Sequence, residues 1–169
     1  KTAYEIYQCD WSSDVCSSDL SLDGVEVPAE AVLGAIGGGL AIVERAQEAA
    51  IAAIAAEAVG SMQALTDLTV EYLQTRKQFG VAIGSFQSLQ HKAVDMFVAV
   101  EQARSMALYA AMMVEAEDAE QRRSAIPAAK VQINRSARFV GHTAMQLHGG
   151  IVMTMEYIAA HHFRRLAMI

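Results

Sequence analysis

The chain has 169 residues, a length typical of one domain and short for two. Hydrophobic residues make up 53% of it and aromatic residues 7%, with proline only twice, a composition that favours closely packed helices. The net charge is −6, of which −3 falls in residues 1–20 and −3 in the remainder, so no basic surface is available for nucleic acid or a membrane. No uninterrupted apolar run reaches the roughly 18 residues of a membrane span. We therefore expect a soluble cytoplasmic protein with no membrane span and no nucleic-acid partner.

The first residues do not suit a folded domain. The run CDWSSDVCSSDL, from Cys9 to Leu20, resembles the translation of a sequencing-library adapter, and its ordinary alternative is a polar serine-rich loop. We expect residues 1–21 to be an artefact or a disordered leader. Cys9 and Cys16 therefore carry no redox or metal prediction.

The next segment, residues 22–36, predicts a short extended stretch that stops near Pro28, because proline disfavours helix in the residue before it. The three glycines that follow predict a loop or helix entry. From residue 40 to residue 76 only Gly60 interrupts the helical pattern, and we expect one long helix rather than two that meet there. Its predicted inner stripe is Ile42, Ala46, Ala49, Ala53, Ala56, Met62, Leu65, Thr69, Tyr72 and Leu73.

Three further helices are expected. A loop at residues 78–86 precedes a helix that Ser85 caps and that runs to about residue 116. Ser124 caps the next helix, with Pro127 in its first turn, and Gly149-Gly150 ends it; the last helix begins near Met155. This predicts an all-α fold, an up-down four-helix bundle after a short extended N-terminal segment. The predicted inner positions are Leu89, Ala93, Met96, Val100, Ala103, Ala107, Ala110 and Val114, then Ala128, Val131, Ala137, Val140, Ala144 and Leu147.

The first motif with chemical content lies after the long helix. It reads RKQFG from Arg76 to Gly80 and continues as SFQSLQH from Ser85 to His91. An arginine beside a glycine-containing loop offers a fork of donors to a phosphate, while Phe79 and Phe86 can pack on a flat ring. The alternative is a capped helix end with two core aromatics.

The second motif, QLHGG, runs from Gln146 to Gly150, and the turn TMEY follows it at residues 154–157. Two adjacent glycines permit left-handed backbone and a close approach by a ligand. They lack the preceding strand and third glycine of a dinucleotide fingerprint. Alone, the pair is also simply a good helix C-cap.

Together and in this order, the motifs resemble the acyl-CoA dehydrogenase family. The matching pattern is R-x-Q-F-G, F-Q-x-x-Q-H, Asp95-Met96, Q-L-H-G-G and T-x-E-Y, and residues 22–34 resemble the family's passage from its middle β-domain. The resemblance implies that residues 22–36 end that β-domain and form a linker. It also implies that residues 37–169 are the C-terminal helical domain, truncated at its C-terminus.

The resemblance also implies a cofactor, FAD, bound by a neighbouring subunit. Arg76, Gln78 and Phe79 would contact it, with Gln87 and Phe86 beside them. The stretch from Gln146 to Gly150 would lie along its adenosine and pyrophosphate, and the predicted contacts there are Gln146, Leu147, Gly149 and Gly150. A shared cofactor implies a homo-oligomer or mixed oligomer, a dimer or tetramer, with an acyl-CoA substrate and an electron-transfer partner.

The implied activity is an oxidoreductase that removes the α-proton of an acyl-CoA thioester while the β-carbon gives a hydride to the flavin. The family's usual carboxylate base falls beyond Ile169, and its alternative position aligns with Ala50, so we expect no catalytic residue in this chain and no activity from it alone. Glu48 is a weak candidate for a substrate contact. His142, His148, His161 and His162 lack zinc-helix spacing, and we expect no metal.

Three other functions stay open. A related acyl-CoA oxidase or flavin monooxygenase would use the same scaffold. A non-catalytic subunit of a mixed acyl-CoA dehydrogenase would lend Arg76 and Gln146 to its partner's FAD. A helical bundle without a cofactor is the simplest alternative.

Overall fold

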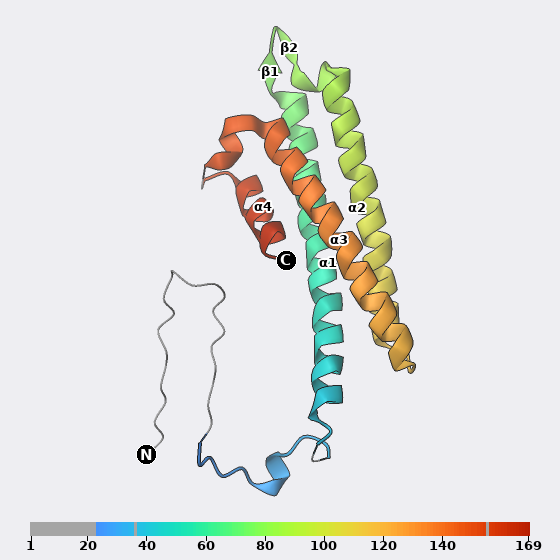
Figure 1. Ribbon diagram of the computed structural model, residues 1–169. Coiled ribbons are helices and arrows are strands. Elements are labelled where there is room, and N and C mark those ends of the chain that lie inside the picture. The colour runs from blue at the N-terminus through green and yellow to red at the C-terminus, as the bar shows by residue number, and fades with distance from the viewer. Residues whose placement is uncertain (1–22, 36, 155) are drawn as a thin grey trace, which may run out of the picture. The chain divides into compact units, whose positions relative to one another are not determined.

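A computed structural model describes residues 23–35, 37–154 and 156–169 (Figure 1). The chain divides into two units, Lys1–Gly39 and Leu40–Ile169. The predictions for residues 1–21, with Cys9 and Cys16, lie outside the described residues. In the described part of the first unit, a single 3-10 turn, η1 (Ala29–Ala31), follows Pro28, whose backbone is extended with φ −67° and ψ 151°. Extended backbone at Pro28 agrees with the sequence prediction, although no β-strand forms in residues 23–35.

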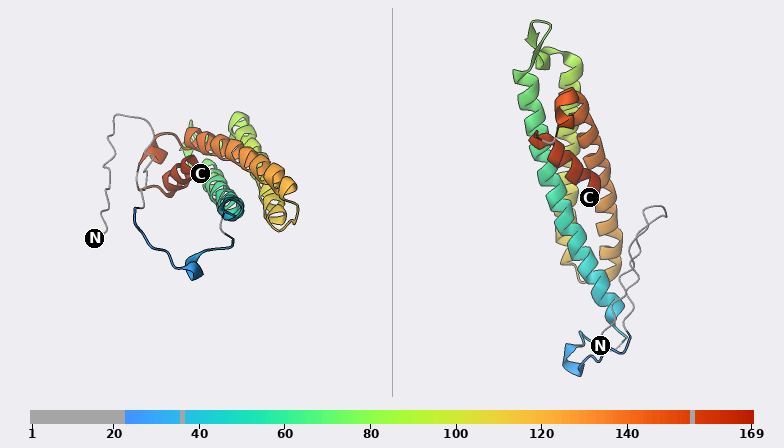
Figure 2. Two further views of the ribbon diagram at one scale, coloured as in Figure 1. Left: turned by 60° about the horizontal axis from the view of Figure 1, so that its bottom comes forward. Right: turned by 90° about the vertical axis from the view of Figure 1, so that its left-hand side faces the viewer.

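The second unit is helical, which confirms the all-α prediction. Its helices are α1 (Gly39–Thr75), α2 (Gln87–Val114), α3 (Ala119–His148) and α4 (Ile158–Met168). Figures 1 and 2 show α1, α2 and α3 running beside one another, with the shorter α4 beside them. An antiparallel hairpin joins α1 to α2, with β1 (Lys77–Gln78) paired to β2 (Val81–Ala82), and η2 (Ile83–Ser85) follows it. The up-down bundle topology stays a prediction, because α4 has only 11 residues.

The long helix α1 passes through Gly60 without a break and has 37 residues, as predicted. By length and composition, it is the one helix in residues 23–35, 37–154 and 156–169 that could cross a membrane. Core helices of soluble proteins meet the same criteria, and α1 places Met62 and Leu65 in the core shared with the other helices.

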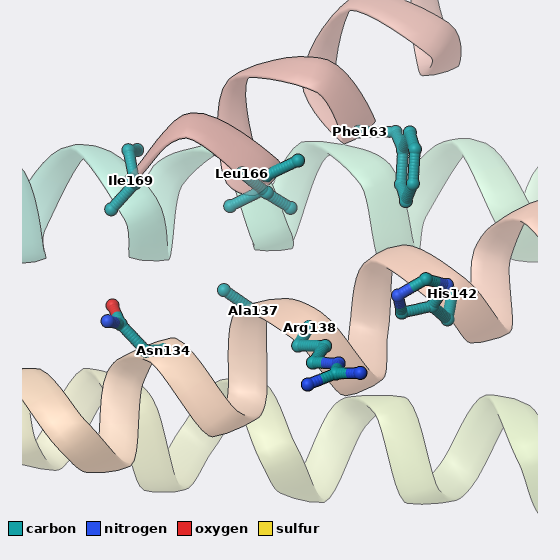
Figure 3. Close-up of a pocket in the computed structure, with 8 residues that line it drawn as sticks. Asn134, Ala137, Arg138, His142, Phe163, Leu166 and Ile169 are labelled. Carbon is teal, nitrogen blue, oxygen red and sulfur yellow. The ribbon is translucent and has the colours of Figure 1, made fainter. Parts of the chain in front are cut away.

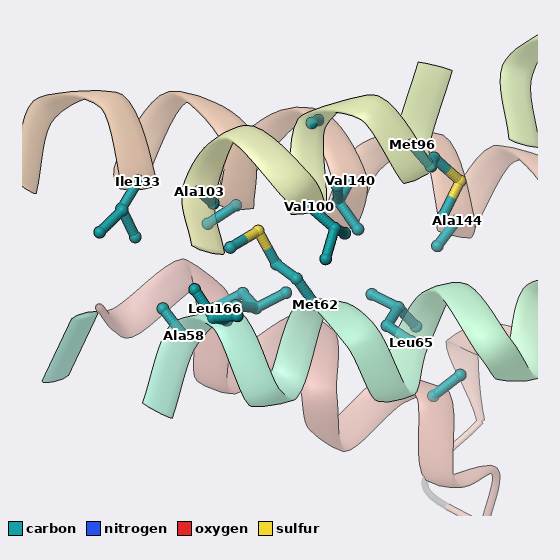
Figure 4. Close-up of a cluster of buried hydrophobic side chains, with 14 of the residues drawn as sticks. Ala58, Met62, Leu65, Met96, Val100, Ala103, Ile133, Val140, Ala144 and Leu166 are labelled. Atoms are coloured by element: carbon teal, nitrogen blue, oxygen red, sulfur yellow. The ribbon is translucent and has the colours of Figure 1, made fainter. Parts of the chain in front are cut away.

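The hydrophobic core gathers side chains from all four helices (Figure 4). Figure 4 shows Met62 of α1 among Val100 and Ala103 of α2, Val140 of α3 and Leu166 of α4. All five side chains are buried. Small alanines let the helices approach while methionine and the branched residues fill the space between them.

The predicted stripe of α1 is right in its second half and wrong in its first. Met62, Leu65, Thr69 and Leu73 are buried, and Tyr72 is half-buried. The first half is alanine-rich on every side, so its hydrophobic pattern does not fix which face turns inward. The predicted positions Ile42, Ala46, Ala49, Ala53 and Ala56 are exposed, and Glu48, Ala55, Ala58 and Val59 are buried instead.

The inner face of α2 is confirmed, with Met96, Val100, Ala103, Ala107 and Ala110 buried and Leu89, Ala93 and Val114 half-buried. In α3 the predicted positions Ala137, Val140, Ala144 and Leu147 are buried, whereas Ala128 and Val131 are exposed, which corrects the prediction. In the first half of α3, the residues that are buried instead follow a spacing of three and four up to Ile133. They are Ala125, Ile126, Ala129 and Ile133.

Three predicted helix starts were wrong. Ser85 lies inside η2 and its hydroxyl donates to the Ala82 carbonyl at 2.7 Å, so α2 starts after Phe86 without a side-chain cap. The cap of α3 is Asp118, whose carboxylate accepts from the Glu120 amide at 2.9 Å, so Ser124 and Pro127 lie within the helix. The last helix begins at Ile158 and not near Met155, because a 3-10 turn of five residues that includes both glycines, η3 (Gly149–Met153), comes before it.

Candidate cofactor-binding site

The first motif forms the hairpin at the end of α1. The Arg76 amide donates to the Tyr72 carbonyl at 2.9 Å, and the Ile83 amide donates to the Arg76 carbonyl at 2.8 Å. At the tip, Gly80 has φ 82° and Phe79 has φ 54°, a left-handed conformation that is rare for a bulky residue. The Phe79 ring is 91% exposed and meets Phe86 edge-to-face, with ring centroids 6.1 Å apart.

Glycine at position 84 lets the chain return across the last turn of α1. A Cβ on Gly84 would lie 2.9 Å from the Leu73 carbonyl oxygen, and that atom cannot move because it belongs to helix backbone. The Gln90 side-chain amide donates to the Gly84 carbonyl at 2.8 Å and holds this crossing to the first turns of α2. Gln87, the first residue of α2, is placed beside the hairpin by this crossing.

The second motif closes α3. Gly149 is the C-cap, with φ 66°, and its amide donates to the Met145 carbonyl, so the predicted helix end is confirmed. A Cβ on Gly149 or Gly150 would meet nothing within 4 Å, which leaves the backbone open to a ligand. Gln146 is exposed, whereas the Leu147 side chain is buried in the core. Leu147 therefore anchors the turn, while Gln146 and the glycines form its surface.

An aromatic cluster joins the two motifs, and the sequence analysis missed it. The ring of His148 lies 4.8 Å from that of Tyr72, four residues before Arg76, and 5.3 Å from that of Tyr157. Burial lowers the pKa of His148, with hydrogen bonding to the carbonyls of Ala144 and Leu68 acting in the opposite direction. Figure 1 shows the hairpin, the start of α2 and the end of α3 at the same end of the helical unit. The sequence signal was a histidine before two glycines and a tyrosine one turn before the arginine.

The groups exposed at this end fit a ligand that carries phosphates and a flat ring. In residues 37–154 and 156–169, no carboxylate forms an ion pair with the exposed Arg76. Gln87 and Gln146 are exposed, and so is Gln78, whose side-chain amide donates to the Lys77 carbonyl at 2.8 Å. Phe79 and Phe86 present ring surface. The alternative of two core aromatics fails, because Phe79 is almost fully exposed. FAD, with its pyrophosphate and ring systems, has the chemistry that this donor set suits.

Glu48 lies elsewhere and is part of an ion-pair network. Its carboxylate accepts from Arg122 at 2.8 Å and faces Arg45 at 3.5 Å. The hydrogen bond from Arg122 lowers the pKa of Glu48, followed by the attraction of both arginine charges, while burial raises it. A carboxylate held ionised by two arginines is a weak proton acceptor, so Glu48 does not fit the role of a general base.

A pocket of about 400 Å³ lies between α3 and α4 (Figure 3). Arg138 and His142 of α3 line one side and Phe163 and Leu166 of α4 the other. None of the predicted cofactor contacts lines it. Among the described residues, no group of three or more His, Cys, Asp or Glu side chains could hold a metal ion.

Comparison with known proteins points to one family. A family model described as "Acyl-CoA dehydrogenase, C-terminal domain" matches residues 37–169. The acryloyl-CoA reductase (NADH) of Anaerotignum propionicum is 32% identical over 141 residues, 83% of this chain and 35% of that protein. The glutaryl-coenzyme A dehydrogenase in complex with glutaryl-CoA superposes with a TM-score of 0.76 at 32% identity, covering 87% of this chain and 37% of that one. PigA with FAD and proline has a TM-score of 0.71 at 31% identity, over 79% and 34%.

The fold defines an all-helical domain. The chain belongs to the acyl-CoA dehydrogenase family, by its C-terminal domain. It spans about a third of the length of the relatives it matches.

Proposed function

We propose that this chain supplies the helical domain of an FAD-dependent acyl-CoA dehydrogenase and contacts the FAD of a neighbouring subunit. The contacts would be Arg76, Gln78, Phe79, Phe86 and Gln87 from the hairpin side, and Gln146, Gly149 and Gly150 from the end of α3. Leu147 would act through the backbone, because its side chain is buried.

The observation that carries the proposal is the hairpin tip. Phe79 is held at positive φ with its ring exposed to solvent, an arrangement that costs free energy in the isolated domain. Arg76 beside it lacks a carboxylate partner in the described residues. Both features are explained if the hairpin meets a ligand bound to another chain.

The reaction removes an α-proton from an acyl-CoA thioester, and bound FAD would accept the hydride from the β-carbon. The part of this chain is to bind and orient. The Arg76 guanidinium would donate two hydrogen bonds to phosphate oxygens, and the open backbone at Gly149 and Gly150 would allow close approach. The exposed amides of Gln78, Gln87 and Gln146 would fix the orientation.

We propose that the proton acceptor comes from outside residues 1–169, so that this chain alone is inactive. The resemblance places the alternative base position at Ala50, whose methyl group cannot accept a proton. Glu48, two residues earlier, is paired with Arg122 and has a lowered pKa.

The assembly would be a homo-oligomer or mixed oligomer, located in the cytoplasm and served by an electron-transfer partner. The ion-paired state of Glu48 favours one further candidate, a non-catalytic subunit of a mixed acyl-CoA dehydrogenase. That subunit would lend Arg76 and Gln146 to its partner's FAD.

The experiment is flavin occupancy in the longer flavoprotein that carries this domain. Arg76→Ala and Gln146→Ala should each lower the ratio of FAD to protein after purification, by about tenfold for the arginine, because a charge-assisted bidentate contact is lost. Absorbance near the flavin maximum measures the ratio.

The matched control is Arg104→Ala, which removes another exposed arginine, in the middle of α2, that pairs with Glu101 at 3.1 Å and donates to Gln63 of α1 at 2.7 Å. It should leave the FAD content unchanged. An unchanged ratio of FAD to protein in both the Arg76 and Gln146 variants would contradict the proposal.

A further inference from the structure

The buried histidine of the second motif, His148, contacts side chains outside its own helix. His148 is 3% exposed, and its Nδ1 lies 2.9 Å from the Ala144 carbonyl oxygen, one turn earlier in α3. A carbonyl only accepts, so Nδ1 carries the proton and the neutral ring leaves Nε2 as an acceptor. Nε2 is buried without a hydrogen-bond partner among the described residues.

The ring contacts of His148 reach two other elements, and the Leu68 carbonyl of α1 also acts on the ring. The Nδ1 hydrogen bond stays within α3 and orients the ring. The face of the ring meets Tyr72 of α1 at 4.8 Å with an interplanar angle of 31°, and Tyr157, which precedes α4, meets it at 5.3 Å and 61°. Tilted and edge-to-face pairs at these distances are attractive beyond the area they bury.

Two members of the stack, Tyr72 and His148, lead directly into the two proposed cofactor segments. The Tyr72 carbonyl accepts from the Arg76 amide at 2.9 Å, so the stacked turn of α1 is the turn that starts the hairpin. On the other side, His148 is followed at once by Gly149 and Gly150. The stack is therefore a contact between the two segments that does not run through the main chain.

We propose that His148 is a positioning residue, whose ring, held between Tyr72 and Tyr157, fixes the spacing between the Arg76–Gly80 hairpin and the Gly149–Gly150 turn. This inference rests on the proposed function for its consequence, since the spacing matters because both segments would hold one FAD. The coupling itself is a property of this chain and is testable without any cofactor.

The experiment is amide hydrogen exchange on the full 169-residue chain with His148→Ala. Two reporter amides are the Ile83 amide, bonded to the Arg76 carbonyl, and the Gly149 amide, bonded to the Met145 carbonyl. Both should exchange about tenfold faster, because the ring that couples the two segments is gone. The Glu115 amide, bonded to the Met112 carbonyl at the C-terminal end of α2, should keep its rate.

The conservative variant His148→Phe separates a ring contact from a hydrogen bond. It keeps the stack, loses the Nδ1 donor and removes the unpartnered buried Nε2, so both reporters should return to their original rates. If the alanine variant does not fold, Tyr72→Leu gives the test from the other side and must speed exchange at Gly149.

Two results would overturn the inference: faster exchange at Gly149 with no change at Ile83, or an equal acceleration at Glu115. A separate readout addresses FAD, which the longer flavoprotein should lose with His148→Ala and regain with His148→Phe. Coupled exchange with unchanged FAD content would leave the positioning role standing and count against the proposed function instead.

Discussion

At the scale of single residues, Arg122 ties three parts of the helical unit together. Its Nε donates to Glu48 of α1 at 2.8 Å, and its Nη1 donates to the carbonyls of Ala116 and Glu117 at 2.6 and 2.9 Å. Those carbonyls follow the end of α2, where helix backbone lacks internal partners. One guanidinium thus satisfies a helix end and a buried carboxylate.

Replacing Glu48 with glutamine should lower the melting temperature at about pH 7 by several degrees, because Arg122 keeps its charge without a partner. The same change at Glu101, an exposed partner of Arg104, should have little effect. The pKa of Glu48 is lowered from its ordinary 4.5 in the folded state, so its contribution is present above that value and disappears as pH falls through the folded pKa. The gap in melting temperature between wild type and Glu48→Gln should therefore narrow as the pH falls below 4.5. Thermal melts at pH values above and below 4.5 measure this gap, and a constant gap would contradict the lowered pKa of Glu48.

The neutral state of His148 gives a second pH dependence with a different window. Burial lowers the pKa of His148 from its ordinary 6.5, so the unfolded chain binds the proton more tightly. The stability of the wild-type chain should fall as pH drops below 6.5, and His148→Phe should remove that part of the slope. Urea denaturation at several pH values measures it, and an unchanged slope in the phenylalanine variant would contradict a buried neutral imidazole.

At the scale of elements, two glycines that look alike in sequence have opposite roles. Gly60 lies mid-helix in α1 with nothing within 4 Å of an added Cβ, and Gly84 has the Leu73 carbonyl oxygen at 2.9 Å. Gly60→Ala should stabilise the chain by about 0.5–1 kcal/mol, because alanine has less backbone entropy to lose. Gly84→Ala should destabilise it by about 1–3 kcal/mol through the backbone clash. Denaturation midpoints that move in the same direction would show that the hairpin does not cross α1 this closely.

The start of α3 offers a test between the sequence-based and the observed helix boundary. Asp118→Ala should cost about 1 kcal/mol, because the Glu120 amide loses its side-chain acceptor. Ser124→Ala should be neutral or slightly stabilising, since position 124 is inside the helix and exposed. A larger loss at Ser124 than at Asp118, measured by chemical denaturation, would favour the boundary that the sequence predicted.

These elements also show how far the sequence could lead. Long apolar periodicity predicted α1 through Gly60 and the inner face of α2, because apolar residues recur in α2 at spacings of three and four from Leu89 through Met96 to Ala110. The alanine-rich first half of α1 has no such contrast. The predicted start of α3 was wrong because several polar residues lie in this region, and only tertiary context selects Asp118 as the cap.

Some features of the candidate site could be predicted from the sequence and others could not. Its two segments could be predicted, because an arginine beside a glycine loop and a glycine pair after a helix are local patterns. The Tyr72–His148 contact was not, since it joins residues far apart in the chain and depends on how α1 and α3 pack. The exposure of Phe79 was not predicted either. It depends on the hairpin, which also sets the positive φ of Phe79, and not on the residue type.

At the scale of the whole helical unit, apolar side chains remain on the surface of α2. Val94, Phe97, Leu108 and Met112 are each more than half exposed. Exposed apolar area of this kind is typical of a domain that packs on other domains or subunits. It agrees with an oligomer in which the hairpin end reaches another subunit's cofactor.

The most direct measurement is the structure of the longer, FAD-bound flavoprotein that carries this domain. We expect the Arg76 guanidinium of one subunit at about 3 Å from a pyrophosphate oxygen of FAD held by its neighbour, with the backbone of Gly149 and Gly150 against the same FAD. A hairpin end that faces solvent, or an FAD contacted by neither segment, would contradict it.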